Sequence, residues 1–245
     1  MTRFVGYPSG SGRPSDTDRG NLNELLMLTE AAISLTNVQR WAQEYVLDVA
    51  RIRSGVGASV APPDARERAK VVQYEVSVVD QFVQLGAQSF ALQGTEALWE
   101  RTFPTGKRGR PPAVDVALFN ARRREESRLE FGFYSRSKLR ADAEKLGADL
   151  PITGDLIVTN YLLLWRMLAV PNRGRNNSWR DECEEAALRA STSTYTVGLR
   201  VWSRQDLFVP EPGRSRLLEV AILSVERRAH ETATNAGETS VPARG

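Results

Sequence analysis

The amino-acid sequence predicts an α/β protein, in which a mixed sheet is flanked by helices and preceded by an N-terminal helical extension. Three patterns predict this fold class. Apolar residues recur at helical spacing early in the chain, as at Val72, Val76, Val79 and Val83. From about residue 95 onward, apolar residues alternate with polar ones, as they do in strands. Within residues 160–165, Asn160 is followed by a continuous apolar run, which is typical of a strand buried on both faces.

The N-terminal part of the chain is expected to contain a tail and three helices. Residues 1–20 are rich in glycine, proline and serine and are expected to be disordered. Residues 21–60 are expected to form the helical extension, with one helix near 22–33 and a second near 41–52. A linker rich in glycine and proline separates these from a third helix, expected near 64–85.

Residues 61–228 are expected to form the α/β domain, and residues 229–245 a disordered tail. A hairpin opens the sheet, because two alternating stretches flank a polar turn. Gly147 is expected to end the helix after the hairpin, and Ser178 to cap the next one. The expected elements are strands at 113–119 and 127–134, a helix at 137–146, a strand at 160–165, a helix at 179–190, and strands at 194–203 and 217–226.

The composition of the 245-residue chain excludes several classes of active site. Its single cysteine, Cys183, cannot form an internal disulfide and fits a cytoplasmic protein. Its single histidine, His230, argues against a Ser-His-Asp triad, a cysteine–histidine pair and a zinc cluster. No apolar run approaches the roughly 18 residues of a membrane span, so no membrane partner is expected. An enzyme of this composition would depend on carboxylates, which suit a hard cation such as Mg²⁺.

Two carboxylates on the expected hairpin, Asp115 and Glu130, are the leading candidates for a site. Cross-strand neighbours lie about 5 Å apart, so this pair could hold one divalent ion. Two carboxylates so close repel each other unless a proton or a cation separates them. The alternative is a pair of polar residues on the solvent face of a half-buried hairpin.

Three stretches of sequence carry a resemblance to a known family. They are Arg-Pro-Pro-Ala-Val-Asp-Val-Ala-Leu-Phe at 110–119, Arg-Leu-Glu-Phe-Gly at 128–132 and Lys-Leu-Arg-Ala-Asp-Ala-Glu-Lys-Leu at 138–146. Together they resemble the core of the PD-(D/E)XK nuclease superfamily, over roughly residues 64–170. The resemblance implies a restriction-endonuclease-like sheet in which Asp115 and Glu130 hold Mg²⁺ for cleavage of phosphodiester bonds in DNA.

The sequence departs from the pattern of this family at the position of its lysine, which helps to orient or activate the attacking water. Gly132 occupies that position. In some members a lysine from the following helix takes its place in space, and the resemblance makes Lys138 and Lys145 the candidates here. They lie seven residues apart on one helix face, with Asp142 between them, and Lys138 lies nearer the strand. The alternative is a solvated helix face with ordinary ion pairs.

Two further features could belong to such a site. Glu75 lies beside the apolar face of the third helix and could be the additional helix acid that some family members use. A surface-facing glutamate is the simpler interpretation. Lys107, Arg108 and Arg110 form a basic turn ahead of the hairpin, which could contact nucleic-acid phosphates or be a solvated loop.

The sequence therefore predicts a Mg²⁺-dependent DNA endonuclease of restriction or defence type, with a homodimer as one possible assembly. The alternative is a catalytically inactive nuclease-fold module that binds DNA or another protein, and Gly132 favours it. A third class is an assembly protein built on the N-terminal helices, which would form a stable oligomer without affinity for nucleic acid.

Overall fold

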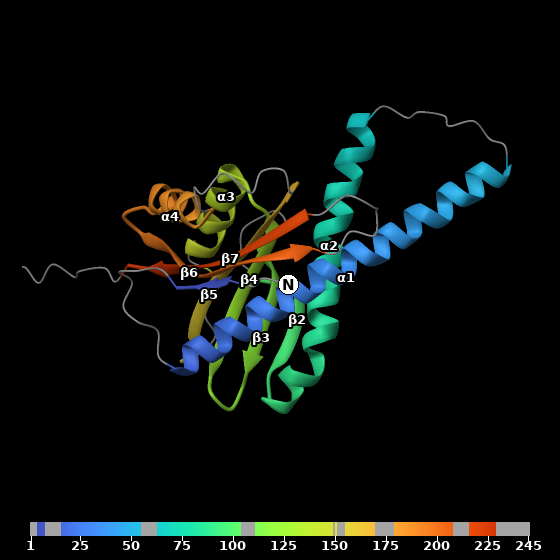
Figure 1. Ribbon diagram of the computed structural model, residues 1–245. Coiled ribbons are helices and arrows are strands. Elements are labelled where there is room, and N and C mark those ends of the chain that lie inside the picture. Colours follow the sequence, from blue (N-terminus) through green and yellow to red (C-terminus); the bar gives the residue numbers. More distant parts are fainter. Residues whose placement is uncertain are drawn as a thin grey trace, which may run out of the picture.

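The computed structural model describes residues 4–7, 16–54, 63–103, 111–148, 150, 155–169, 179–207 and 216–228 (Figure 1). These segments contain four helices and seven strands. In chain order they are β1 (Phe4–Gly6), α1 (Asp16–Ser54), α2 (Pro63–Leu92), β2 (Glu96–Thr102), β3 (Ala113–Asn120), β4 (Glu125–Phe133), α3 (Arg136–Gly147), β5 (Ile157–Ala169), α4 (Trp179–Ala190), β6 (Tyr195–Leu207) and β7 (Arg216–Arg227).

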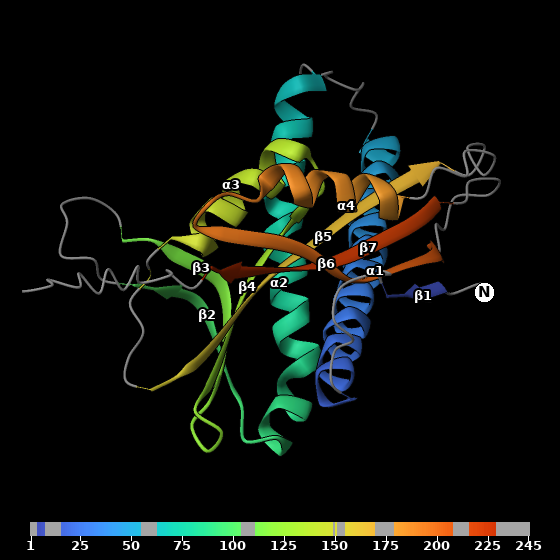
Figure 2. The same ribbon diagram turned by 90° about the vertical axis from the view of Figure 1, so that its left-hand side faces the viewer.

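The strands form one seven-stranded sheet in the order β1-β6-β7-β5-β4-β3-β2. Neighbouring strands are antiparallel except β4 and β5, which are parallel and are joined by α3 as a crossover. Helices α1 and α2 cover one face of the sheet, and α3 and α4 cover the other (Figures 1 and 2). The prediction of an α/β protein with a mixed sheet flanked by helices is confirmed.

Residues 4–6 and 16–20 are part of this fold. Residues 1–20 are expected to be disordered, but Phe4–Gly6 pair with the outer edge of β6 and α1 begins at Asp16. Gly6 permits this pairing because a Cβ atom there would lie 2.5 Å from Nε1 of Trp202. Composition alone does not reveal a strand held by backbone pairing.

Helix α1 is continuous where the sequence predicts a break between two helices. Thr36 and Asn37, which lie between the two expected helices and would suit a helix cap, lie inside α1. Thr36 is buried, and Asn37 Nδ2 lies 3.5 Å from Sδ of Met167 on β5. The sheet packs against the helix at this level, so these polar side chains face protein instead of ending the helix.

One core fills the space between the sheet and helices α1 and α2. Leu26 and Ile33 of α1 and Phe82 of α2 are fully buried there together with Phe131 of β4. The rings of Phe82 and Phe131 meet edge to face, with centroids 5.0 Å apart. Because Phe131 directly follows Glu130, this packing fixes the strand that carries the candidate site.

The expected hairpin is present as β3 and β4, and the helix that follows it as α3. Ser135 caps α3, since its side chain accepts a hydrogen bond from the backbone N–H of Lys138 at 3.1 Å. Gly147 is the last residue of α3, as predicted, but its backbone is not in the left-handed region and Ala148 is the C-cap. The role of Gly147 is one of packing, because a Cβ atom there would lie 2.4 Å from Cδ1 of Tyr195. The expected cap of α4, Ser178, lies outside the described residues.

Strand β2 has no counterpart among the expected elements. It is an edge strand, and most of its seven residues are exposed or half-buried. An edge strand of this kind lacks the alternation that identifies a half-buried strand. In the part of the chain that the structure describes, no helix has the length and apolar character needed to cross a bilayer.

The substitution Phe82→Ala tests the packing that fixes β4. Loss of a fully buried ring that contacts Phe131 is expected to lower the free energy of unfolding by about 3–5 kcal/mol. Urea denaturation measures this change. Val76→Ala on the same helix is the control, because Val76 is 53% exposed and should alter stability by no more than about 0.5 kcal/mol. Equal effects of the two substitutions would contradict the proposed packing.

Candidate active site

The candidate site lies where β3 and β4 separate. Their ladder runs from Asn120↔Glu125 to Val116↔Leu129, and the next pair in this register would be Asp115 and Glu130. Beyond the end of the ladder, the backbone N–H of Phe131 donates a hydrogen bond to Oδ2 of Asp115 at 2.8 Å. A backbone donor of β4 therefore holds the Asp115 carboxylate beside Glu130.

Glu130 is almost fully enclosed, with 1% of its surface exposed. Its Oε1 lies 2.6 Å from Nζ of Lys145 on α3. Burial, and secondly the nearby Asp115 carboxylate, raise the pKa of Glu130 from 4.5 to about 8, although Lys145 opposes this shift. The Glu130 carboxyl therefore keeps its proton near neutral pH unless further positive charge approaches it.

The side chain of Lys138 occupies the space that a side chain at position 132 would otherwise fill. A Cβ atom at Gly132 would lie 2.3 Å from Cε of Lys138 and 3.2 Å from its Nζ. The stem of Lys138 thus passes over the bare backbone of Gly132, and its ammonium group lies close to where a side chain of residue 132 would begin. Any larger residue at 132 would displace Lys138.

The charge of Lys138 is maintained by carboxylates around it. Its Nζ lies 3.1 Å from Oδ2 of Asp142, one helical turn further along α3. Burial opposes the ammonium form, but the carboxylates of Asp142, Glu75 and Asp115 outweigh burial and raise the pKa of Lys138. Lys138 is therefore a charged hydrogen-bond donor at neutral pH.

Glu75 reaches the site from the helical layer on the opposite face of the sheet. Its Oε1 accepts a hydrogen bond from the backbone N–H of Phe133 at 3.1 Å and lies 3.4 Å from the Cβ position at Gly132. On α2 it precedes the buried residues Val78, Val79 and Phe82 at the spacing of one inner stripe. The stripe expected from the sequence included Val76, which is exposed, so the buried face is rotated towards Glu75.

Asp142 is a member of the cluster that the sequence analysis treats only as part of an ion-pair pattern. It is buried, and this burial raises its pKa, although Lys138 and then Lys145 oppose the shift. Its position four residues after Lys138 and three before Lys145 placed it on the same face. The spacing along the sequence could therefore have identified Asp142 as a member of the cluster. It could not have predicted that Asp142 is buried.

The structure brings together Asp115, Glu130, Lys138, Lys145 and Glu75, the five candidates for catalytic roles. The other three candidates, Lys107, Arg108 and Arg110, lie outside the described residues.

The cluster has more negative than positive groups. With Asp142 included, four carboxylates surround two ammonium groups, so two negative charges remain when all six are ionised. Among the described residues, no three aspartate, glutamate, histidine or cysteine side chains converge as a complete metal site. Mg²⁺ commonly uses only one or two carboxylates and takes its other ligands from water and substrate phosphates. Asp115 and Glu130 fit that donor set.

The substitution Glu130→Gln tests the buried carboxyl through the pH dependence of stability. The pKa of Glu130 is higher in the folded protein, so the folded state binds more protons between about pH 4.5 and pH 8. The stabilising contribution of the protonated carboxyl is therefore lost as the pH rises through this range. The glutamine variant cannot lose a proton and should gain stability relative to wild type, by at most about 5 kcal/mol, levelling off above pH 8.

Urea denaturation from pH 5 to pH 9, with a chelator present, measures this difference in the free energy of unfolding. Glu144→Gln is the control, because Glu144 is exposed on the same helix and should parallel wild type. Parallel curves for wild type and Glu130→Gln would show that Glu130 has an ordinary pKa.

Comparison of the chain with protein-family models, with curated proteins and with solved structures finds no match. A functional assignment consequently depends on the geometry and chemistry of the cluster around Gly132.

Proposed function

We propose that this protein is a Mg²⁺-dependent endonuclease of restriction or defence type that cleaves phosphodiester bonds in DNA. The order of elements supports a restriction-endonuclease-like core. Helix α2 is followed by the edge strand β2, the hairpin β3–β4, α3 and the buried strand β5, which is parallel to β4. Apart from β2, this matches the order of helix, hairpin, helix and buried strand that the resemblance to the PD-(D/E)XK superfamily implies. Asp115 and Glu130 lie on the two strands of the hairpin.

The contact between Lys138 and Gly132 is the observation that carries the proposal. The family lysine is missing from the sequence at position 132, but an ammonium group lies 3.2 Å from the point where that side chain would begin. A solvated helix face would not hold Lys138 there, because the side chain would extend into water. Asp142 instead fixes its ammonium group within the cluster.

The residues of the cluster have separable roles in this proposal. Asp115 and Glu130 would hold Mg²⁺, which, when bound, polarises the scissile phosphate and lowers the pKa of a coordinated water. Lys138 would orient the attacking water through its N–H groups, with Asp142 positioning the ammonium group. Lys145 favours the charged form of Glu130 that a metal ligand requires. The N–H of Phe131 fixes the orientation of Asp115.

Exposed arginines beside the cluster support a polyanionic substrate. Arg136 and Arg140 lie on the exposed side of α3, and Arg101 lies on β2 opposite Val114, next to Asp115. Side chains of this type neutralise backbone phosphates without selecting a sequence. The proposed DNA contacts therefore surround the cluster on two elements, α3 and β2.

A catalytically inactive binding module is the second candidate function, and Gly132 is the observation that favours it. It predicts salt-dependent binding to duplex DNA that does not respond to Mg²⁺. A binding module of this kind would not require Lys138 to lie over Gly132.

The substitution Asp115→Asn tests the proposed metal ligand. Loss of the carboxylate charge should reduce Mg²⁺-dependent nicking of plasmid DNA more than about 100-fold. Substituting a residue that binds the metal directly lowers activity more than substituting a residue that only hydrogen-bonds to such a ligand. A gel assay of supercoiled plasmid measures nicking. Asp155→Asn is the control, since Asp155 is exposed and pairs only loosely with Arg124 at 3.5 Å. Equal nicking by both variants, or none by wild type with Mg²⁺, would exclude the proposed activity.

The double substitution Gly132→Lys with Lys138→Ala tests the exchange in space. Lys138→Ala alone should lower the nicking rate about 100-fold or more. Gly132→Ala should also lower it while preserving the fold, because the new Cβ displaces only the flexible end of Lys138. A lysine at 132 should restore part of the activity lost in Lys138→Ala. Glu144→Gln, exposed on α3 and outside the cluster and the proposed DNA contacts, is the control and should nick at the wild-type rate. Failure of the double variant to exceed Lys138→Ala would contradict the exchange.

A further inference from the structure

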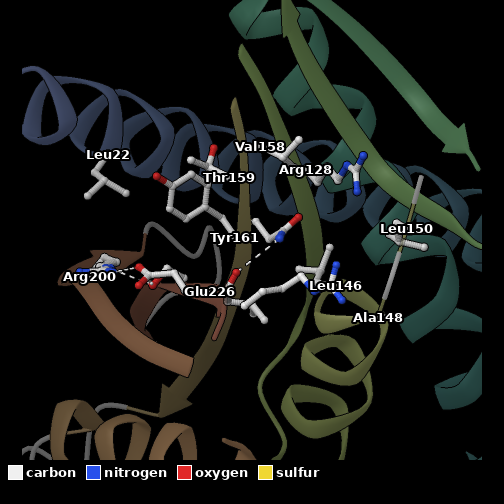
Figure 3. A pocket seen from close by; sticks show the side chains of 14 residues that line it. Leu22, Arg128, Leu146, Ala148, Leu150, Val158, Thr159, Tyr161, Arg200 and Glu226 are labelled. Carbon is white, nitrogen blue, oxygen red and sulfur yellow. Dashed lines mark hydrogen bonds and ion pairs between the residues drawn. The ribbon is translucent and has the colours of Figure 1, made fainter. Parts of the chain in front are cut away.

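A cavity of about 610 Å³ lies beyond the C-terminal end of α3. Figure 3 shows Leu146 and Leu150 on one side of it and Arg200 with Glu226 on the other. Its volume falls in the range of pockets that hold small organic ligands. Nothing in the proposed nuclease mechanism uses this cavity.

The cavity exists because the sheet divides at this point. Strands β5 and β7 pair from Ala169↔Arg216 to Tyr161↔Ser224. Beyond Tyr161, β5 continues along β4 to Ile157, whereas β7 continues along β6 to Arg227. The two halves of the sheet separate there, and the cavity lies at the division.

Asn160 is the first residue of β5 beyond the paired region, and its amide is only partly satisfied. Its Nδ2 donates a long hydrogen bond of 3.4 Å to the carbonyl oxygen of Val225 across the division. Its Oδ1 is buried and has no hydrogen-bond partner among the described residues. A buried acceptor without a partner is costly, so a ligand that brings an N–H donor would be favoured at this point.

Two of the three arginines of the cavity wall, Arg128 and Arg200, are already paired with glutamates. Arg128 is buried, pairs with Glu126 at 3.0 Å and lies over the ring of Phe103 at 4.3 Å. Arg200 pairs with Glu226, and its Nε donates to Oγ of Ser224 at 2.7 Å. A phosphate or carboxylate would have to compete with these partners. The wall therefore favours the uncharged part of a ligand.

We propose that this cavity binds a nucleobase with an amino group beside a ring nitrogen, as in adenine, and that Asn160 recognises it. An asparagine amide matches this edge with two hydrogen bonds, since Oδ1 accepts from the amino group and Nδ2 donates to the ring nitrogen. The apolar residues of the wall suit the faces of the base; they are Leu22, Leu146, Leu150, Val158 and Val225.

The cavity adjoins the candidate active site. Arg128 precedes Glu130 by two positions on the same face of β4, a distance of about 7 Å along a strand, and Leu146 directly follows Lys145. The base could therefore belong to a free nucleoside or to an unpaired nucleotide of a bound strand. The shared chemistry is the same, and the two sources are separable by experiment.

Calorimetric titration of the full chain with adenosine and with inosine tests the proposal. Inosine carries an oxygen in place of the amino group, so its binding should be about tenfold weaker or more. Asn160→Ala and Asn160→Asp should weaken adenosine binding to a similar extent. Asp115→Asn should bind adenosine like wild type, so a failure of the nuclease proposal and a failure of this one are distinguishable.

A second arm uses short single strands containing one adenine or one hypoxanthine among thymines, titrated with a chelator present. If wild type binds adenosine more tightly than inosine and the Asn160 variants do not, the ligand is a free nucleoside. The same preference in the strand arm alone identifies an unpaired base. Equal binding of the two bases by wild type in both arms overturns the proposal, even if the Asn160 variants fail to fold. Preference for adenine that survives in both folded Asn160 variants also overturns it.

Discussion

The separation of β3 from β4 beyond Val116 and Leu129 is the constraint on which the candidate active site depends. A continued ladder would leave Asp115 and Glu130 as ordinary neighbours on one sheet face. Because the strands part, the N–H of Phe131 is directed to the Asp115 carboxylate. The end of β4 is likewise accessible to Glu75 from the helical layer on the opposite face of the sheet. Glu75 accepts a hydrogen bond there from the backbone N–H of Phe133.

Burial and charge act against each other in this cluster. Enclosure of Glu130 disfavours its charged form, and Lys145 only partly offsets this, since the pKa of Glu130 still rises to about 8. For Lys138 the balance is reversed, because the surrounding carboxylates outweigh burial. Lys138 is thus charged at neutral pH, whereas the most buried carboxyl, that of Glu130, keeps its proton. An arrangement that keeps an acid partly protonated until a cation arrives is expected of a site selected for function more than for stability.

The sequence predicts the local elements that carry the site, but it misses the edge strands β1 and β2 and the long-range contacts. Alternation located β3 and β4, and helical spacing located α3, so the positions of Asp115, Glu130 and the two lysines followed from short segments. Glu75 was named as a candidate, but its bond to Phe133 joins residues 58 positions apart, which no local pattern encodes. The burial of Asp142 and the buried, unpartnered amide oxygen of Asn160 beside the cavity depend on the same kind of long-range packing.

Gly132 illustrates why a residue missing from a motif need not be missing from a site. As a position in sequence, it removes the lysine that the resemblance requires. In the folded protein, Gly132 allows Lys138 to lie over β4, because any Cβ at position 132 would lie 2.3 Å from Cε of Lys138. The glycine and the helix lysine are therefore one packing feature, and neither can be interpreted alone. A comparison of residues position by position along the chain would show only a missing lysine. The distance of 3.2 Å from the Cβ position at Gly132 to Nζ of Lys138 shows that an ammonium group lies there in space.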